Sequence, residues 1–369
     1  EKFMAVASRA LSGAALLRRN ARGRTSTARR AGPVAVSADA KKVLIVNTNG
    51  GGHANIGFWL CKELATAGHS VTIMVVGEEA DTKMNKPPFT YFDQLRAAGV
   101  NTIWGSPADV AAAAGPGAAF DVVVDNNGKD IDAVGPVIDF ALAAGASQFL
   151  FVSSAGMYIP KGSTPGQPPY VEGDAVKESA GHAQVEAKLA ETGLKWSSFR
   201  PQYITGYGSN KDCEEWFFDR IVRGRPVPIP GDGTTFTSVS AASDLGAMLA
   251  AAVGNDAAAG QLFNCVSGES VTLNQMVAMC ANACGVSDFK IVHYDPKEAG
   301  VEVKKAFPFR PVDFHSEPRN AKALLGWAPR VRLADALAAR FEEYKASGRA
   351  EKEMQFELDD VILASNVGA

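Results

Sequence analysis

The chain has 369 residues, of which 46% are hydrophobic and 21% are charged, and its formal net charge is −3. This length and composition suit one or two globular domains with a large core, and no apolar run approaches the ~20 residues of a membrane span. The five cysteines are scattered and odd in number, which disfavours a disulfide framework.

Residues 1–38 differ in composition from the rest of the chain. They hold Lys2 and seven arginines against Glu1 alone, and Ser, Thr and Ala fill most other positions. This Arg-rich and acid-poor segment predicts an organelle transit peptide, with a disordered basic arm that binds RNA as the alternative. Because the segment contributes +7 to the net charge of −3, the remainder carries about −10. Such a body is not a general polyanion binder, and any nucleic-acid site on it must be a local patch.

Strand and helix patterns alternate along residues 39–200. The predicted strands are 42–47, 70–76, 102–104, 120–125 and 148–153, and the helical patterns are one that ends near residue 68, then 107–114, 131–144 and 175–192. This alternation predicts an α/β fold, a Rossmann-like doubly wound parallel sheet. We expect residues 201–350 to form a smaller C-terminal α/β lobe that is interleaved with the first domain and contacts the substrate or RNA. Residues 351–369 are predicted to be a polar tail.

A glycine loop follows the first strand and opens the first helix, which is the context of a dinucleotide-binding fingerprint. Gly51 permits the tight turn and Gly57 the close packing of helix and strand, whereas Ala54 stands at the middle position with Gly52 nearby. At the end of the second strand, residues 75–77 are Val-Val-Gly, and no acid stands where one would hold a ribose. The loop therefore supports the fold and leaves the binding of NAD or NADP open.

Polar residues end the fourth predicted strand, at the edge where open α/β sheets place their ligands. Asp125 is the candidate metal ligand and catalytic carboxylate, Asn126 a positioning group beside it, and Asp139 a supporting carboxylate. The alternative is a polar loop, with the neighbouring aspartates capping the next helix. His53 and His182 are further candidates for proton transfer.

The segment 304–315 interleaves cations with phenylalanines on an otherwise acidic body. Aromatic rings can stack on bases while Lys and Arg meet phosphates. The candidate RNA-binding residues are Lys304, Lys305, Phe309 and Arg310. The alternative is a packed loop with solvated charges.

Several motifs, taken in order, resemble the extended short-chain dehydrogenase/reductase family of the nucleotide-sugar epimerase type. They are the glycine loop, VSSAGMY at 152–158, RP at 200–201, GDG at 231–233, LFNCVSG at 262–268 and LLGWAP at 324–329. The resemblance implies a cofactor site formed by Gly51, Gly52, Gly57 and Ser154. However, the Tyr and Lys of the family's Tyr-x-x-x-Lys motif are replaced by Glu178 and His182, which cannot supply the same proton relay and steady cation.

The only Tyr-x-x-x-Lys string in the chain, Tyr207 to Lys211, lies in a predicted loop far beyond Ser154. We interpret it as a chance match. Classical dehydrogenase chemistry is therefore disfavoured by the sequence, although the scaffold is that of a dehydrogenase.

A second set of motifs is similar to the a-type branch of the chloroplast stem-loop binding proteins. It comprises KPPF at 86–89, DNNGKD at 125–130, VEGDAVK at 171–177, RPQY at 200–203, NKDCEEWFFDR at 210–220 and VHYDPK at 292–297. The resemblance implies a stromal chloroplast protein that binds RNA and cleaves stem-loops with a divalent metal such as Mg²⁺. It also implies roles in transcript and rRNA processing and stability, association with the chloroplast ribosome, and hetero-oligomers with a b-type paralogue. The alternatives are an NAD(P)-dependent reductase or epimerase and a non-catalytic RNA or ribosome scaffold.

Overall fold

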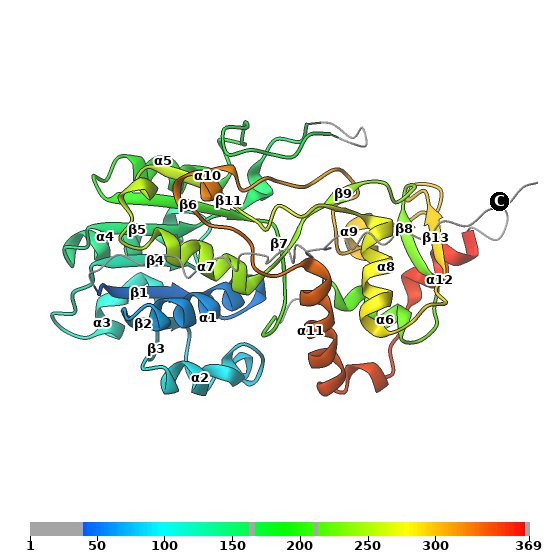
Figure 1. Cartoon of the computed structure of the whole chain (residues 1–369), viewed down its shortest axis with the longest axis horizontal. Coiled ribbons are helices and arrows are strands. Elements are labelled where there is room, and N and C mark those ends of the chain that lie inside the picture. Colours follow the sequence, from blue (N-terminus) through cyan, green and yellow to red (C-terminus); the bar gives the residue numbers. More distant parts are fainter. Residues whose placement is uncertain (1–39, 162–166, 210–212, 366–369) are drawn as a thin grey trace, which may run out of the picture. The chain divides into compact units, whose positions relative to one another are not determined.

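A computed structural model describes residues 40–161, 167–209 and 213–365 (Figure 1). Its main sheet has seven strands in the order β11-β6-β5-β4-β1-β2-β3, and every neighbouring pair is parallel. The strands are β1 (Lys42–Asn47), β2 (Ser70–Val76), β3 (Asn101–Gly105), β4 (Val122–Asn126), β5 (Gln148–Val152), β6 (Lys195–Pro201) and β11 (Gln261–Cys265). The predicted Rossmann-like doubly wound sheet is thereby confirmed.

Both faces of the sheet are covered by helices (Figure 1). Successive side chains of β1 point to opposite faces, so Val43 and Ile45 pack into one core and Leu44 and Val46 into the other. The first core is completed by α1 (Gly51–Thr66), α2 (Phe92–Ala97), α7 (Ala242–Ala252) and α10 (Arg319–Leu324), and the second by α3 (Val110–Ala114), α4 (Ile131–Ala143) and α5 (Gly181–Ala190). The β1 strand is therefore apolar along its length.

Helix α5 is shorter than the predicted helix over 175–192. The segment before it pairs with the chain after β5, where the backbone N–H of Lys177 donates to Met157 O at 2.9 Å and Ile159 N–H donates to Ala175 O at 3.0 Å. Residues bound in this way cannot also enter a helix, and α5 begins at Gly181. Glu178 consequently lies in a turn outside the helix that carries His182.

Among the described residues of 201–350, four helices that do not cover the main sheet and three small two-stranded pairs form the C-terminal lobe. Its helices are α6 (Glu215–Ile221), α8 (Leu273–Cys284), α9 (Val303–Ala306) and α11 (Leu333–Ala346). The pairs are β7 (Tyr203–Thr205) with β10 (Val239–Ala241), β9 (Phe236–Thr237) with β12 (Val271–Thr272), and β8 (Val227–Pro230) with β13 (Ile291–Tyr294). Since α7, β11 and α10 belong to the sheet layers, the chain after residue 200 returns to the first domain before it completes the lobe.

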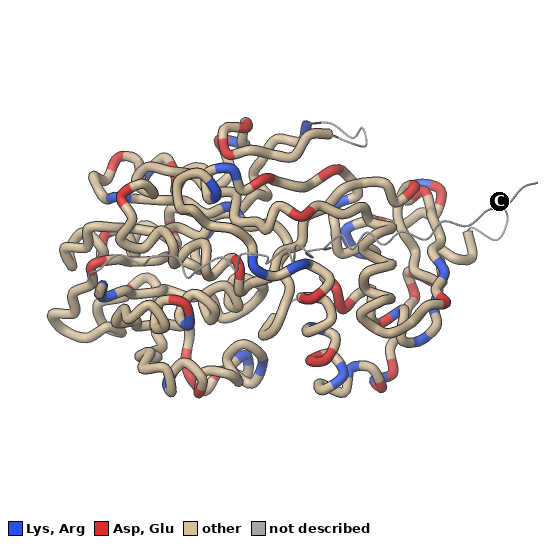
Figure 2. The backbone as a smooth tube through the Cα atoms, viewed as in Figure 1, with Lys and Arg blue, Asp and Glu red and all other residues tan. Residues whose placement is uncertain are grey.

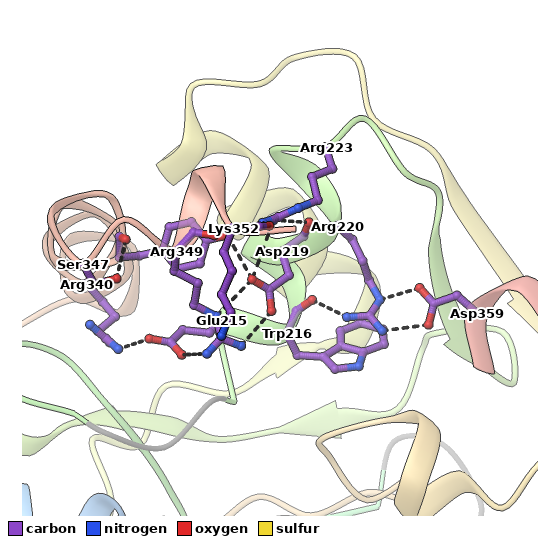
Figure 3. A network of polar contacts seen from close by, with 11 residues as sticks. Glu215, Trp216, Asp219, Arg220, Arg223, Arg340, Ser347, Arg349, Lys352 and Asp359 are labelled. Atoms are coloured by element: carbon purple, nitrogen blue, oxygen red, sulfur yellow. Dashed lines mark hydrogen bonds and ion pairs between the residues drawn. The ribbon is translucent and has the colours of Figure 1, made fainter. Parts of the chain in front are cut away.

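Buried ion pairs join the helices of this lobe (Figure 3). Arg340 on α11 contacts Glu215 on α6, and Arg349 Nη2 lies 2.9 Å from Asp219 Oδ2. The segment predicted as a polar tail includes α12 (Glu357–Ser365), whose Asp359 meets Arg220 at 2.7 Å with both side chains almost fully buried. Within the part of the chain that the structure describes, no helix is long and apolar enough to cross a membrane.

Candidate functional site

A cavity of about 270 Å³ opens at the carboxyl ends of β1, β4 and β5. The strand order reverses between β1 and β4, and open α/β sheets bind ligands at this switch point. Ten residues line the cavity, namely Thr48, Gly50, Gly51, Gly52, His53, Asn127, Gly128, Lys129, Ser154 and His182. The cavity thus brings together the glycine loop, the loop after β4, the end of β5 and the start of α5.

The glycine loop is shaped by close backbone approaches. Gly51 has a φ of +70°, a conformation that side chains disfavour. A Cβ at Gly57 would lie 1.9 Å from Asn47 Oδ1, so only glycine lets α1 pack this closely on the end of β1. No acidic residue stands in the first turn of α1, and the positive end of this helix faces the cavity. These features agree with the turn expected at Gly51 and the close packing expected at Gly57, whereas the role of both glycines in binding a cofactor stays a prediction.

Asn126 holds the glycine loop against the sheet. Its Nδ2 donates to Asn47 Oδ1 and to the backbone carbonyl of His53, both at 2.7 Å. Asn126 is fully buried and does not line the cavity. In this conformation its amide positions the loop, and it has no direct access to a bound substrate.

Asp125 is also fully buried, one residue earlier on β4. Its Oδ1 accepts hydrogen bonds from the backbone N–H groups of Asn127 at 3.0 Å and Gly128 at 2.7 Å, which fixes the turn after the strand. Burial raises the pKa of Asp125 to about 6, and the two hydrogen bonds oppose that rise. Asp139 lies on the exposed side of α4 and does not line the cavity.

These carboxylates do not form a donor set for a metal ion. No carboxylate lines the cavity, and Asp125 uses one oxygen to hold backbone N–H groups. Among residues 40–161, 167–209 and 213–365, no group of three or more His, Cys, Asp or Glu side chains is placed to hold a metal ion. The described residues therefore do not fit the Mg²⁺ that the family resemblance implies.

Ser154 and His182 do face the cavity. Ser154 Oγ accepts a hydrogen bond from the N–H of Gly156 at 3.0 Å, and the His182 ring lies 6.0 Å from that of Phe151. Burial lowers the pKa of His182, Glu186 and Asp130 oppose that change, and Lys129 reinforces it. A neutral histidine thus stands near the place of the family's lysine.

The cavity fits the phosphates of a dinucleotide better than it fits the rest of that cofactor. The glycine loop, Ser154 and Lys129 offer N–H groups, a hydroxyl and a cation. At the end of β2, Gly77 has no side chain and Glu78 is exposed to solvent, so neither reaches into the cavity as a ribose acceptor. These residues could hold a pyrophosphate but lack the Tyr and Lys needed for hydride chemistry.

Sequence reasoning missed Lys129, which lines the cavity together with Thr48 and Asn127. The signal was present, because Lys129 follows Asp125 and Asn126 at the carboxyl end of a central strand, where ligand-binding loops begin. The second half of the Tyr207 to Lys211 string lies outside the described residues, as does the segment 1–38.

The predicted RNA patch of the C-terminal lobe is only partly exposed. Lys304 and Lys305 are exposed, and Lys305 Nζ pairs with Glu302 at 2.8 Å. Phe309 is 4% exposed and packs edge-to-face on Tyr203 with 4.6 Å between ring centroids, so its ring is not available to a base. Figure 2 shows basic and acidic residues interspersed along the backbone.

Arg310 lies between this lobe and the cavity. Its Nη2 donates to the backbone carbonyl of Gly156 at 3.3 Å, and its guanidinium carbon lies 4.1 Å from the centroid of the Phe314 ring. Gly156 in turn donates to Ser154 at the cavity wall. Arg310 is therefore linked to the cavity wall through Gly156 and Ser154.

The family of NAD dependent epimerases and dehydratases matches residues 50–265 of this chain. Solved structures with the same fold include a dTDP-glucose 4,6-dehydratase of Bacillus anthracis in complex with NAD, with 12% identity, a TM-score of 0.64, and 84% of this chain and 98% of that chain covered. A UDP-glucuronic acid 4-epimerase of Bacillus cereus with NAD has 14% identity, a TM-score of 0.63, and covers 83% of this chain and 99% of its own. The chain belongs to the NAD dependent epimerase/dehydratase family.

The chain is also similar to the chloroplast stem-loop binding protein of 41 kDa b from Arabidopsis thaliana. The two are 33% identical over 346 residues, which is 91% of this chain and 88% of the relative. This match confirms the resemblance to the chloroplast stem-loop binding proteins and the chloroplast location that the sequence predicts. The relative is of b type, and the a-type assignment of this chain stays a prediction.

Proposed function

We propose that this protein binds stem-loop RNA in the chloroplast stroma and cleaves it as an endoribonuclease. The observation that carries the proposal is the 33% identity to a stem-loop binding protein over nearly the whole chain. The loss of the Tyr and Lys of the proton relay supports it, because an oxidoreductase of this family needs both groups. Roles in transcript and rRNA processing, ribosome association and assembly with a b-type paralogue belong to the same proposal.

Cleavage of RNA requires a group that activates the nucleophilic oxygen and one that protonates the leaving oxygen. His53 and His182 are the imidazole side chains of the cavity wall, and imidazole can accept or donate a proton. Asp125 and Asn126 support the wall from beneath through the contacts described above. Because the described residues do not fit a divalent metal, we assign no step of the cleavage to one.

An NAD(P)-dependent reductase or epimerase is the second candidate function. The cavity at the switch point and the glycine loop favour it. A third possibility is a scaffold that binds RNA or ribosomes without catalysis. Substrate-dependent changes in the absorbance of NADH distinguish the second function from the other two.

The proposed function is tested by incubating an end-labelled stem-loop RNA with the purified full-length chain, in Mg²⁺ and in EDTA, beside the variant His182→Ala. Binding with cleavage that falls in the variant supports a nuclease at this cavity. Cleavage that is lost in EDTA adds the metal requirement that the resemblance implies. Binding without cleavage under both conditions refutes the nuclease, and absence of binding refutes the proposed function.

A further inference from the structure

The cavity is lined by basic and not by acidic side chains, whereas the chain as a whole is acidic. Lys129, His53 and His182 contribute to its wall, and no Asp or Glu does, although residues 39–369 carry a net charge of about −10. No ion pair involving Lys129 is formed within the described ranges, where its side chain is exposed. An exposed cation that forms no ion pair at a cavity attracts anions.

The loop after β4 produces this charge by turning its own carboxylates toward its backbone. Asp125 Oδ1 accepts from Asn127 and Gly128. Asp130 Oδ1 accepts from the N–H of Ala133 at 3.0 Å and caps α4. Lys129, between the two aspartates in sequence, is left to face the cavity. The two carboxylates of the loop therefore bind backbone N–H groups, while the ammonium group of Lys129 is available to a ligand.

The opposite wall lets a ligand approach the main chain. A Cβ atom placed on Gly50 or Gly51 would meet nothing within 4 Å, so the space over these two glycines is open. A phosphate can therefore approach the backbone of this loop, and Lys129 lines the same cavity. Both walls are suited to the same group, a phosphate.

We propose that the cavity holds one backbone phosphate of a bound RNA, a site distinct from the predicted patch at Lys304 and Lys305. This inference rests on the proposed function. Lys129 provides the charge, His182 a second donor when it is protonated, and the glycine loop main-chain N–H groups. The RNA strand that leaves the cavity passes Ser154 and reaches Arg310, which contacts the adjoining Gly156.

A consequence is that RNA and a dinucleotide exclude one another. Both ligands carry phosphates, and these would compete for the same contacts with Lys129 and the glycine loop at the cavity wall. The site lacks an acceptor for the adenosine ribose at Gly77, so its contacts select phosphate and not the nucleoside. Binding of NADH is therefore expected to lower the affinity for RNA.

The test measures the affinity of the full-length chain for a fluorescent stem-loop RNA at several salt concentrations. Lys129→Ala is compared with Lys188→Ala, an exposed lysine of α5 that pairs with Glu191 and does not line the cavity. We expect Lys129→Ala to weaken binding about tenfold, as for the loss of one charge-assisted hydrogen bond, and to flatten the salt dependence by about one phosphate contact. Lys188→Ala is expected to match the wild type.

Equal affinity and salt dependence for Lys129→Ala and the wild type would overturn the inference while the proposed function stands. The inference would also be overturned if NADH binds to the protein, as monitored by the fluorescence of NADH, and the affinity for RNA does not change. A wild-type chain that binds no stem-loop RNA overturns the proposed function itself. Since Lys129 is exposed, its removal does not disturb the core, and a loss of binding is not a folding defect.

Discussion

Replacing Asp125 by Asn separates its structural role from a catalytic one. The amide oxygen of Asn can accept the same two hydrogen bonds from Asn127 and Gly128 that Oδ1 now accepts. The substitution removes the buried negative charge, and it places an NH2 group where Oδ2, which has no hydrogen-bond partner among the described residues, now lies. If burial of that charge is as unfavourable as the raised pKa indicates, the variant is more stable than the wild type at neutral pH.

The magnitude follows from the shift of the Asp125 pKa from 3.8 to about 6. The folded state binds the proton more tightly than the unfolded state, so stability declines as the pH rises from about 4 to about 6 and stays lower above that range. A shift of this size corresponds to about 3 kcal/mol at pH 7.5. At pH 7.5 the free energy of unfolding of Asp125→Asn is expected to exceed that of the wild type by part of this amount, because the buried NH2 group offsets about 1–3 kcal/mol of the gain. At pH 4 no gain in stability is expected.

Urea unfolding followed by circular dichroism at the two pH values measures the effect. Asp139→Asn is the matched control, because Asp139 is exposed on α4 and its removal is expected to change stability by less than about 0.5 kcal/mol. The reasoning would be refuted if Asp125→Asn is less stable than the wild type at pH 7.5. It would also be refuted if the substitution changes the free energy of unfolding by the same amount at both pH values. If the variant is stable but no longer cleaves RNA, Asp125 has a catalytic role despite its burial.

Three further outcomes are expected. The affinity for RNA rises only as the pH falls below 6.5, the ordinary pKa of histidine, because burial lowers the pKa of His182 and the ring gains a proton beside the phosphate below that value. His182→Gln flattens this profile, and an unchanged profile in the variant would show that His182 does not contact the phosphate. Replacing both Lys304 and Lys305 by Ala makes the plot of log affinity against log salt concentration less steep, by the equivalent of about two phosphate contacts. An unaltered slope would show that this patch does not contact RNA. Asp359→Ala leaves Arg220 unpaired and lowers stability by about 3–5 kcal/mol, whereas Asp360→Ala, at an exposed position, changes thermal unfolding much less; equal effects would contradict the role assigned to the buried pair.

Five of the seven strands of the sheet could be predicted from the sequence, because strands that are buried on both faces are marked by apolar runs. Strands β6 and β11, which carry several polar residues, were not among the predicted strands. The predicted strands 42–47 and 70–76 agree with β1 and β2 to the residue. The glycine loop could also be predicted, because the close packing of α1 on β1 requires a glycine at position 57. Apolar runs and the glycine pattern were therefore sufficient to predict these strands and this loop.

The candidate site was less predictable, because it depends on contacts between distant segments. Residues 175–177 pair with the chain after β5, and this pairing sets the start of α5. The helical pattern of the sequence carries no information about such a contact. The Phe309 ring fills the core between Tyr203 and Phe217, although its neighbours in sequence are cations typical of an RNA surface. The orientation of Asp125, toward its own loop and away from the cavity, follows from the turn geometry after β4.

The central claim is that this chain binds stem-loop RNA. The most direct measurement is the affinity of the full-length protein for a stem-loop RNA and for an RNA of the same composition that cannot pair, at one fixed salt concentration. The account predicts that the stem-loop is bound, and bound more tightly than the unpaired RNA. Failure to bind either RNA, or equal affinity for both, would contradict it.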